Sequence, residues 1–467
     1  MKYLFFGSTV VMLGMSLVAW RWQPGAVSDR IELVWCSDDN PARREQIELF
    51  NRLYPEYHVR LDPMNANMEK VIVQSLAGVG PDLFDCYSGF QLVAYVRSGI
   101  ALDCTDFLES RGVEPRSIWP CAWPTFVYEG RMYGHPENVS APAMWFNKDM
   151  FDKAGEPYPS PGWTWEDFIA VAQRLTKRDA RGRLEQLGFI GYWDYMSALG
   201  QWGANIYTPE GTRSALDSPQ AAEAMQFMQD LIYKYGVMPT PTEEDAMASA
   251  GGWGFGTIAL FGAGRGAMAI GGRWWLCILR NEDYANLRLG AVELPRGPST
   301  RVFGIGKSTL VNANSRKRDG ALLFLEFLHG RAWGGLINHQ ADGLAPVIEH
   351  NYTDTYLHDP EFPKEDYNDV WRAALEDAAP QEVSSYVNGQ TVERILRVQT
   401  DLVRANLKSG AEAMRDAAKK INAAITEAAS YRPAADIEQL RRDPVLKDQY
   451  HTEIANGAKP AWSAAGR

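Results

Sequence analysis

Cysteine and histidine are scarce in this chain of 467 residues, which has five cysteines and seven histidines. The histidines are scattered without an H-E-x-x-H pattern, and the cysteines have no C-x-x-C spacing, so we expect no metal ion and no other cofactor. Five cysteines are also too few for a disulfide scaffold. We expect mostly buried, unpaired thiols. An oxidising compartment would permit one or two disulfide bridges among Cys36, Cys86, Cys104, Cys121 and Cys277.

Positive charge is also in short supply. Lys and Arg number 47 against 58 Asp and Glu, so the net charge is −11 at pH 7. Without a long basic run, such a chain is unsuited to binding nucleic acid or anionic lipid through its body. Its 46% apolar and 22% charged residues are ordinary for a globular protein. The length predicts about two to four domains.

Motifs for nucleotide binding and hydrolysis are incomplete or missing. Residues 304–309 resemble the end of a phosphate loop, but Arg301 stands where its first glycine belongs. No G-x-S-x-G elbow occurs. Asp82, Asp85 and Glu137 could supply a carboxylate pair for glycoside hydrolysis, although a chain with 58 acidic residues offers such pairs by chance.

The first 20 residues hold a long apolar run. Residues 3–20 are uncharged and largely apolar, with Lys2 before them and Arg21 after them. The run predicts export, through a secretory signal cleaved near residues 26–28 or through an uncleaved membrane anchor. The body of the chain is therefore expected in the periplasm or another extracytoplasmic space, with residues 3–20 as a tether if they are retained.

Aromatic residues are plentiful, with 16 Trp, 20 Tyr and 18 Phe. A large aromatic core explains most of them. Because Trp and Tyr pair an apolar ring with a polar group, the remainder suggests a ligand groove.

The hydrophobic periodicity predicts alternating strands and helices. Residues 31–35 form a predicted strand, Ile47, Phe50 and Tyr54 recur at helical spacing, and residues 57–61 alternate as a strand does. Strand, helix and strand with short joins form a βαβ unit, which predicts a parallel sheet under helices. Further segments are predicted as a strand at 82–87 and as helices at 71–76, 90–97, 164–175, 218–235 and 392–429.

The letters N-K-D-M-F-D-K-A-G at residues 147–155, followed by P-x-P at 159–161 and T-W-E-D-F at 164–168, form a recognisable group. They resemble the Y-N-K-D-L-F-K-K-A-G…P-x-T-W-E-E-F signature of extracellular solute-binding proteins of carbohydrate ABC importers (family 1, maltodextrin-binding-like). Weaker matches stand in the family's order at residues 35–40, 50–55, 80–82, 99–103, 133–136, 261–274 and 343–346. Phe146, Arg265 and Gly266 depart mildly from the pattern, and the family's lipid-attachment cysteine is missing.

The resemblance implies an α/β fold with two lobes, the type II periplasmic-binding-protein fold. We expect parallel-type sheets with helices on both faces and hinge crossovers between the lobes. Discontinuous lobes follow from these crossovers: residues 29–140 with 300–350 form lobe 1, and residues 141–299 with 351–430 form lobe 2. Residues 1–28 are then the signal or anchor, and residues 431–467 a C-terminal tail.

The implied function is non-enzymatic binding of a sugar or oligosaccharide between the closing lobes by a monomer, and its delivery to an ABC transporter permease. Two alternatives stay open. The chain could be a secreted glycoside-active enzyme, or the same fold could bind another solute such as a polyamine.

Several residues are candidate ligand contacts because of their own sequence context. Polar side chains after the first strand lie at the carboxyl end of a sheet, where α/β proteins bind ligands, although Asn40 could equally cap a helix. Other candidates are aromatic residues in glycine-rich or irregular loops, and polar residues beside glycines. This set comprises Asp38, Asp39, Asn40, Trp193, Tyr195, Trp253, Phe255, Arg273 and Asp342.

Other candidates come from the resemblance. It implies contacts from Tyr87, Phe90 and Gln91 at the end of the predicted strand 82–87, although Phe90 could belong to the core. Near the first crossover it implies contacts from Asn138 and Ser140. Trp274 matches the family's stacking tryptophan, and Trp275 should then point into the core.

Overall fold

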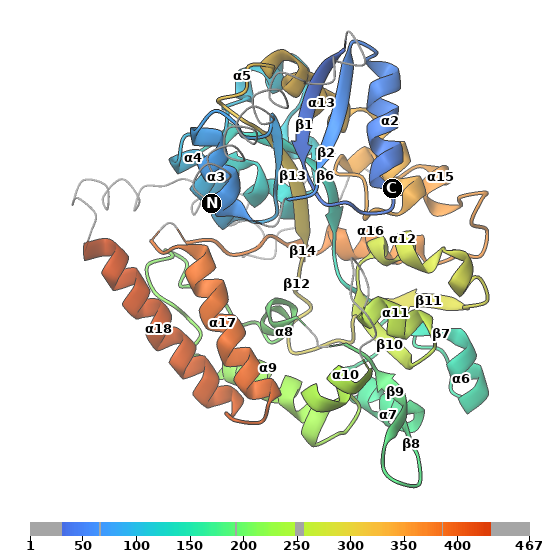
Figure 1. Cartoon of the computed structure of the whole chain (residues 1–467). Coiled ribbons are helices and arrows are strands. Elements are labelled where there is room, and N and C mark those ends of the chain that lie inside the picture. The colour runs from blue at the N-terminus through green and yellow to red at the C-terminus, as the bar shows by residue number, and fades with distance from the viewer. Residues whose placement is uncertain (1–29, 65–66, 192–193, 248–255, 385, 431–467) are drawn as a thin grey trace, which may run out of the picture.

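Two five-stranded sheets organise the protein, shown here as a computed structural model (Figure 1). The structure describes residues 30–64, 67–191, 194–247, 256–384 and 386–430. The predicted signal or anchor, the C-terminal tail and the three aromatic candidates Trp193, Trp253 and Phe255 lie outside these ranges. Within the described ranges, no helix combines the length and the apolar character needed to span a bilayer.

The first sheet confirms the predicted βαβ unit and adds a late strand to it. Its order is β2-β1-β3-β13-β6, with bounds β1 Ile31–Cys36, β2 Tyr57–Asp62, β3 Leu83–Cys86, β6 Gly134–Ser140 and β13 Ile305–Val311. Strand β1 runs parallel to β2 and β3. Strand β13 is antiparallel to both of its neighbours, so the sheet is mixed and the expected parallel arrangement holds only for its first three strands.

Helices from two distant parts of the chain cover this sheet: α2 Arg43–Leu53, α3 Met68–Leu76, α4 Gly89–Arg97, α5 Thr105–Ser110, α13 Arg318–His329 and α14 Arg331–Gln340. Phe50, predicted on the buried face of α2, is fully buried and lies 5.0 Å from Phe324 and 5.3 Å from Phe327 between ring centroids. Edge and tilted ring packing of this kind fixes α13 against α2.

The second sheet is predominantly antiparallel, and here the expected parallel pairing is wrong. Its order is β11-β7-β10-β9-β8, with bounds β7 Ala143–Asn147, β8 Lys177–Arg178, β9 Leu184–Phe189, β10 Gly266–Gly271 and β11 Leu289–Val292. Only β9 and β10 run parallel. Around it lie α6 Lys148–Ala154, α7 Trp165–Leu175, α8 Tyr195–Gln201, α9 Pro219–Tyr233, α10 Pro241–Met247, α11 Thr257–Gly262 and α12 Leu276–Leu279.

Local helix signals in the sequence are confirmed. Thr164 and Asp167 form a reciprocal capping box at the start of α7. Ser218 caps α9, with Pro219 in its first turn. Asn147 accepts a hydrogen bond from the backbone N–H of Met150 and so begins α6.

The last part of the chain, in orange and red in Figure 1, contains α15 Asp354–Leu357, α16 Asn368–Glu376, α17 Gly389–Arg404 and α18 Gly410–Ser430. Helices α17 and α18 pack along α9, whereas α15 packs against α14. The helix predicted over 392–429 is thus two helices, separated where Asn406 adopts a φ of 58°. Two short pairs complete the described strands: β4 Val127–Tyr128 with β5 Arg131–Met132, and β12 Val302–Phe303 with β14 Ala378–Ala379.

All five cysteines are free thiols, and all but Cys277 are buried. Burial raises the pKa of Cys121 to about 12, so this thiol stays protonated and unreactive at neutral pH. No disulfide bridge forms among these five cysteines, and Cys104 and Cys121, the closest pair in the sequence, are both free.

Candidate ligand-binding site

A cavity of about 860 Å³ is lined by residues from both sheet regions. The first sheet contributes Asp38 after β1, the segment 87–91 after β3 and residues 140–142 after β6. The second contributes α8, the end of β10 and the turn after it. Residues 206–207, Phe303, Ile305, residues 381–384 and α17 complete the lining, which therefore comes from segments far apart in the sequence.

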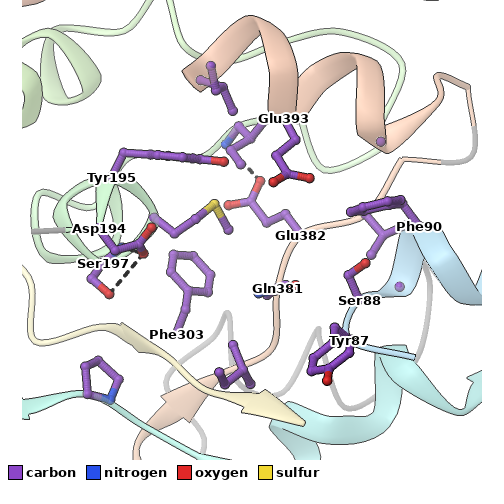
Figure 2. A pocket seen from close by; sticks show the side chains of 18 of the residues that line it. Tyr87, Ser88, Phe90, Asp194, Tyr195, Ser197, Phe303, Gln381, Glu382 and Glu393 are labelled. Atoms are coloured by element: carbon purple, nitrogen blue, oxygen red, sulfur yellow. Dashed lines mark hydrogen bonds between the residues drawn. The ribbon is translucent and has the colours of Figure 1, made fainter. Parts of the chain in front are cut away.

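Six aromatic side chains line the cavity: Tyr87, Phe90, Tyr195, Tyr207, Trp274 and Phe303. Figure 2 shows Tyr195 and Phe303 on one side and Tyr87 with Phe90 on the other, around Gln381 and Glu382. Flat apolar rings on opposite walls suit a ligand that has apolar faces of its own.

The short turn Arg273–Trp275 separates three neighbouring side chains into different environments. Trp274 lines the cavity, whereas Trp275 is only 4% exposed and packs edge-on against Phe261 at 5.9 Å. Arg273 is fully buried, and its guanidinium donates to Asn368 and to two backbone carbonyls. The structure therefore brings Trp274 to the cavity and keeps Arg273 away from it.

Behind Tyr87 lies a buried cluster of charged groups centred on Lys307 of β13. The Lys307 amine contacts Asp38 and lies 3.1 Å from Asp85 and 2.9 Å from Glu137. Arg43 lies 2.9 Å from Asp38 and 3.2 Å from Glu137. Three carboxylates thus face two cations in a largely buried region, which favours one retained proton.

The pKa values in this cluster diverge for that reason. Burial, and after it the charge of Asp85, raise the pKa of Glu137 to about 8. Burial opposes ionisation of Asp38, but Lys307 and Arg43 outweigh it and hold the pKa of Asp38 well below its usual range. A proton on Glu137 at neutral pH leaves the cluster without net charge.

Tyr87 connects this cluster to the cavity. Its hydroxyl lies 3.2 Å from Asp85 Oδ2 and 3.4 Å from Asp38 Oδ1, and the Lys307 amine lies 5.6 Å from its ring. The ring itself is 38% exposed. A ligand that stacks on Tyr87 would therefore meet a side chain whose position the charged cluster fixes.

Three further carboxylates reach the cavity from the second region. Asp194 caps α8 by accepting from the backbone N–H of Ser197 at 3.1 Å, and Glu393 projects from α17. Glu382 accepts from the backbone N–H groups of Ile206 at 2.9 Å and Tyr207 at 3.1 Å. Burial raises the pKa of Glu382, and Asp194 is exposed at the cavity wall.

The structure brings seven of the predicted candidates to one cavity and leaves others outside it. The lining includes Asp38, Tyr87, Phe90, Gln91, Ser140, Tyr195 and Trp274. Asp39 is exposed elsewhere, and Asn138 is half-buried in β6. Asn40 and Asp342 are buried against each other, with 3.3 Å between the Asn40 amide and the Asp342 carboxylate, and Gln46 also donates to Asp342.

These placements correct several expectations. Asn40 accepts from the backbone N–H of Ala42 two residues on, which turns the chain but does not cap α2. Its amide N–H donates a hydrogen bond to the Asp342 carboxylate, and neither side chain lines the cavity. Asp85 and Glu137, which were candidates for a pair of carboxylates in glycoside hydrolysis, do lie close together. Both side chains are fully buried behind the cavity wall, however.

Sequence reasoning missed Glu382, Glu393, Asp194, Lys307 and Arg43. Lys307 lies in residues 304–309, which the sequence analysis interpreted only as an incomplete phosphate loop. In the structure this segment belongs to β13 of the first sheet, and Lys307 is a buried cation there. Glu382 lies in an irregular segment without any motif, so no local pattern could have identified it.

Among the described residues, no group of three or more His, Cys, Asp or Glu side chains has the arrangement to hold a metal ion.

Residues 37–333 match the family model described as bacterial extracellular solute-binding protein. The chain belongs to that family. A protein of Brucella abortus (strain 2308) is 27% identical over 297 residues, which are 61% of this chain and 67% of the relative.

Two solved structures of similar fold accompany this match. An ABC substrate-binding protein of Listeria monocytogenes in complex with cycloalternan superposes with a TM-score of 0.72 at 22% identity, covering 85% of this chain and 99% of the other. A maltose/maltodextrin-binding domain of Bdellovibrio bacteriovorus bound to maltotriose has a TM-score of 0.67 at 18% identity, covering 85% and 100%. The two-lobe fold expected of a solute-binding protein is thereby confirmed.

Proposed function

We propose that this protein binds a sugar or oligosaccharide in the cavity, without catalysing a reaction, and delivers it to an ABC transporter permease. The observation that carries the proposal is the lining itself, in which aromatic rings and carboxylates from both sheet regions surround one cavity of about 860 Å³. Cavities of this size enclose ligands of one to a few sugar rings.

The chemistry of the lining suits pyranose rings. The C–H faces of a pyranose are apolar and stack on flat rings such as Trp274 and Tyr87. The hydroxyls at its edges are hydrogen-bond donors, and carboxylates such as Asp38 and Glu393 accept strong hydrogen bonds from them. The two similar structures named above hold cycloalternan and maltotriose, which are oligosaccharides.

The same proposal includes the lobes and their motion. Lobe 1 comprises residues 29–140 and 300–350, and lobe 2 comprises residues 141–299 and 351–430. Every strand of the first sheet falls in the former ranges and every strand of the second in the latter. Closure of two such lobes around a ligand is a hinge motion, and it requires only one copy of the chain.

Thermal-shift and calorimetric titration with a panel of neutral and charged oligosaccharides tests the binding. A ligand that binds only the folded state raises the melting temperature, and the rise grows with the logarithm of the ligand concentration above the Kd. Incubation of the same sugars with the protein, followed by product analysis, tests the absence of catalysis. Saturable binding without product supports the proposal, whereas hydrolysis products would replace it with the glycoside-active alternative.

Cell fractionation tests the proposed location outside the cytoplasm. Removal of residues 1–28 leaves β1 intact, because this strand begins at Ile31. We expect the shortened protein to stay in the cytoplasm in a folded, ligand-binding form, and the full chain to be exported. Export of the shortened protein would contradict the role assigned to residues 3–20.

A further inference from the structure

The cavity lining is acidic without a basic side chain among its described residues. Asp38, Asp194, Glu382 and Glu393 all line it, and no Lys, Arg or His does. The internal segments outside the described ranges, residues 65–66, 192–193, 248–255 and 385, contain no basic residue in the sequence either. A cavity with carboxylates and no facing cation has a negative potential, which its low-dielectric walls strengthen.

The carboxylates differ in how well nearby cations compensate them. Asp38 is paired with Arg43 and Lys307 behind the wall. Glu393 forms an exposed ion pair with Arg397 at 3.1 Å on α17.

Glu382 and Asp194 have weaker compensation. Glu382 feels the charge of Arg301, but that guanidinium donates to Asn205 and Ala204 and lies 5.1 Å from the Phe303 ring. No described cation lies within ion-pair distance of Asp194 or Glu382.

Glu382 also has an unused acceptor. Its Oε2 atom takes both backbone hydrogen bonds, whereas its Oε1 atom is buried and has no hydrogen-bond partner. A buried carboxylate oxygen without a donor is costly, so the site is incomplete until a ligand supplies one. Figure 2 shows the Glu382 and Glu393 side chains approaching each other on the side of the cavity where Tyr195 lies.

Two phenols share the field of these acids. Burial is the largest cause that raises the pKa of Tyr195 and of Tyr207. The charges of Asp194 and Glu393 raise the pKa of Tyr195 further, and the charge of Glu382 raises that of Tyr207. All three carboxylates therefore act on the same small region of the lining. Aromatic faces beside carboxylates are the surroundings that an organic cation prefers, because ring quadrupoles and acids both attract positive charge.

We propose that the ligand is a sugar carrying at least one protonated amine, which lies between Glu382, Asp194 and Glu393 while the sugar faces stack on the aromatic rings. This inference rests on the proposed sugar-binding function and adds the charge of the ligand. A neutral sugar would leave the negative field uncompensated, and a uronic acid would be repelled by it.

Sugars of similar size that differ in charge test the inference on the full chain. The β-1,4-linked dimer of glucosamine, its di-N-acetylated form and cellobiose share one backbone and differ at C2. Kanamycin against maltotriose gives a second, α-linked comparison, and spermidine is the amine without a sugar. We expect at least one amino sugar to bind about tenfold to a hundredfold more tightly than its neutral partner, since a charge-assisted contact replaces a neutral one.

The Glu382→Gln variant locates the amine. Glutamine keeps an acceptor for the two backbone N–H groups and removes the charge, so we expect the preference for the amino sugar over its neutral partner to fall about tenfold. Because burial disfavours the ionised form of Glu382 in the folded protein, this change should not lower the melting temperature. Glu185→Gln, the same change at an exposed position of β9, is the matched control and should alter nothing.

The outcomes separate this inference from the proposed function. Equal or tighter binding of the neutral sugars, or an unchanged preference in Glu382→Gln, overturns the inference and leaves the sugar-binding function standing. Binding of spermidine without any sugar overturns both. Failure of both amino sugars to bind also overturns the inference.

Discussion

Two neighbouring tryptophans have opposite surroundings at the end of β10. Trp274 lines the cavity and Trp275 packs on Phe261 in the core. We expect Trp274→Ala to weaken sugar binding about tenfold to a hundredfold, because loss of one stacked ring face costs on the order of 1–3 kcal/mol. The melting temperature should change little. Calorimetric titration and thermal melting of the same preparation measure the two effects separately.

Trp275→Ala is the internal control for this prediction. Removal of a buried ring should lower the free energy of unfolding by about 3–5 kcal/mol. A strongly destabilised Trp274→Ala variant that still binds normally when folded would contradict the assignment of Trp274 to the cavity.

Glu137 predicts an unusual dependence of stability on pH. Its pKa is raised from 4.5 to about 8 in the folded protein by burial and by Asp85. Between these values the folded protein holds a proton that the unfolded chain releases, so this group lowers the stability as pH rises from about 5 to 8. Glu137→Gln imitates the protonated form. We therefore expect the free energy of unfolding of this variant to fall by about 1–3 kcal/mol less than that of the wild type between pH 5 and pH 8.

Urea unfolding at pH 5 and pH 8 checks this expectation. The two proteins should be similar in stability at pH 5, and the variant should be the more stable at pH 8. Glu185→Gln serves again as the exposed control. Parallel pH profiles for the wild type and Glu137→Gln would show that the retained proton resides elsewhere.

At the scale of the element, helix α14 carries two adjacent glycines with different surroundings. A Cβ on Gly334 would lie 2.2 Å from the ring of buried His350, whereas a Cβ on Gly335 would meet nothing within 4 Å. We expect Gly334→Ala to destabilise the protein by about 1–3 kcal/mol through overpacking. Gly335→Ala should stabilise it by about 0.5–1 kcal/mol through helix propensity. Chemical unfolding measures both, and equal effects would contradict the packing of α14 on His350.

At the scale of the whole molecule, the cavity predicts a change of shape on binding. Its lining comes from both sheet regions, so a ligand that contacts both walls favours a closed arrangement. Small-angle X-ray scattering should show a smaller radius of gyration at saturating sugar than without it. Trp274→Ala at the same sugar concentration should show a smaller change. An unchanged radius at saturation would contradict closure of the lobes.

Much of the local architecture could be predicted because its causes lie within a few residues. The capping pair Thr164 and Asp167, the proline after Ser218 and the spacing of Phe50 predicted their helices correctly. The family, and with it the two-lobe fold, followed from motif order. The position of the antiparallel strand β13 could not be predicted in this way. Its place in the first sheet depends on pairing with β3 and β6, which lie far from it in the sequence.

The sequence by itself determined the start of several helices, the family and part of the cavity lining, because caps, periodicity and motifs are properties of contiguous residues. Only the tertiary structure decided which charges meet. Asp38 and Lys307 are 269 positions apart, and Glu382 receives its hydrogen bonds from residues more than 170 positions earlier. Burial and charge pairing depend on that long-range geometry, which also withdrew Asn40, Asp342 and Arg273 from the cavity and placed Glu382 within it.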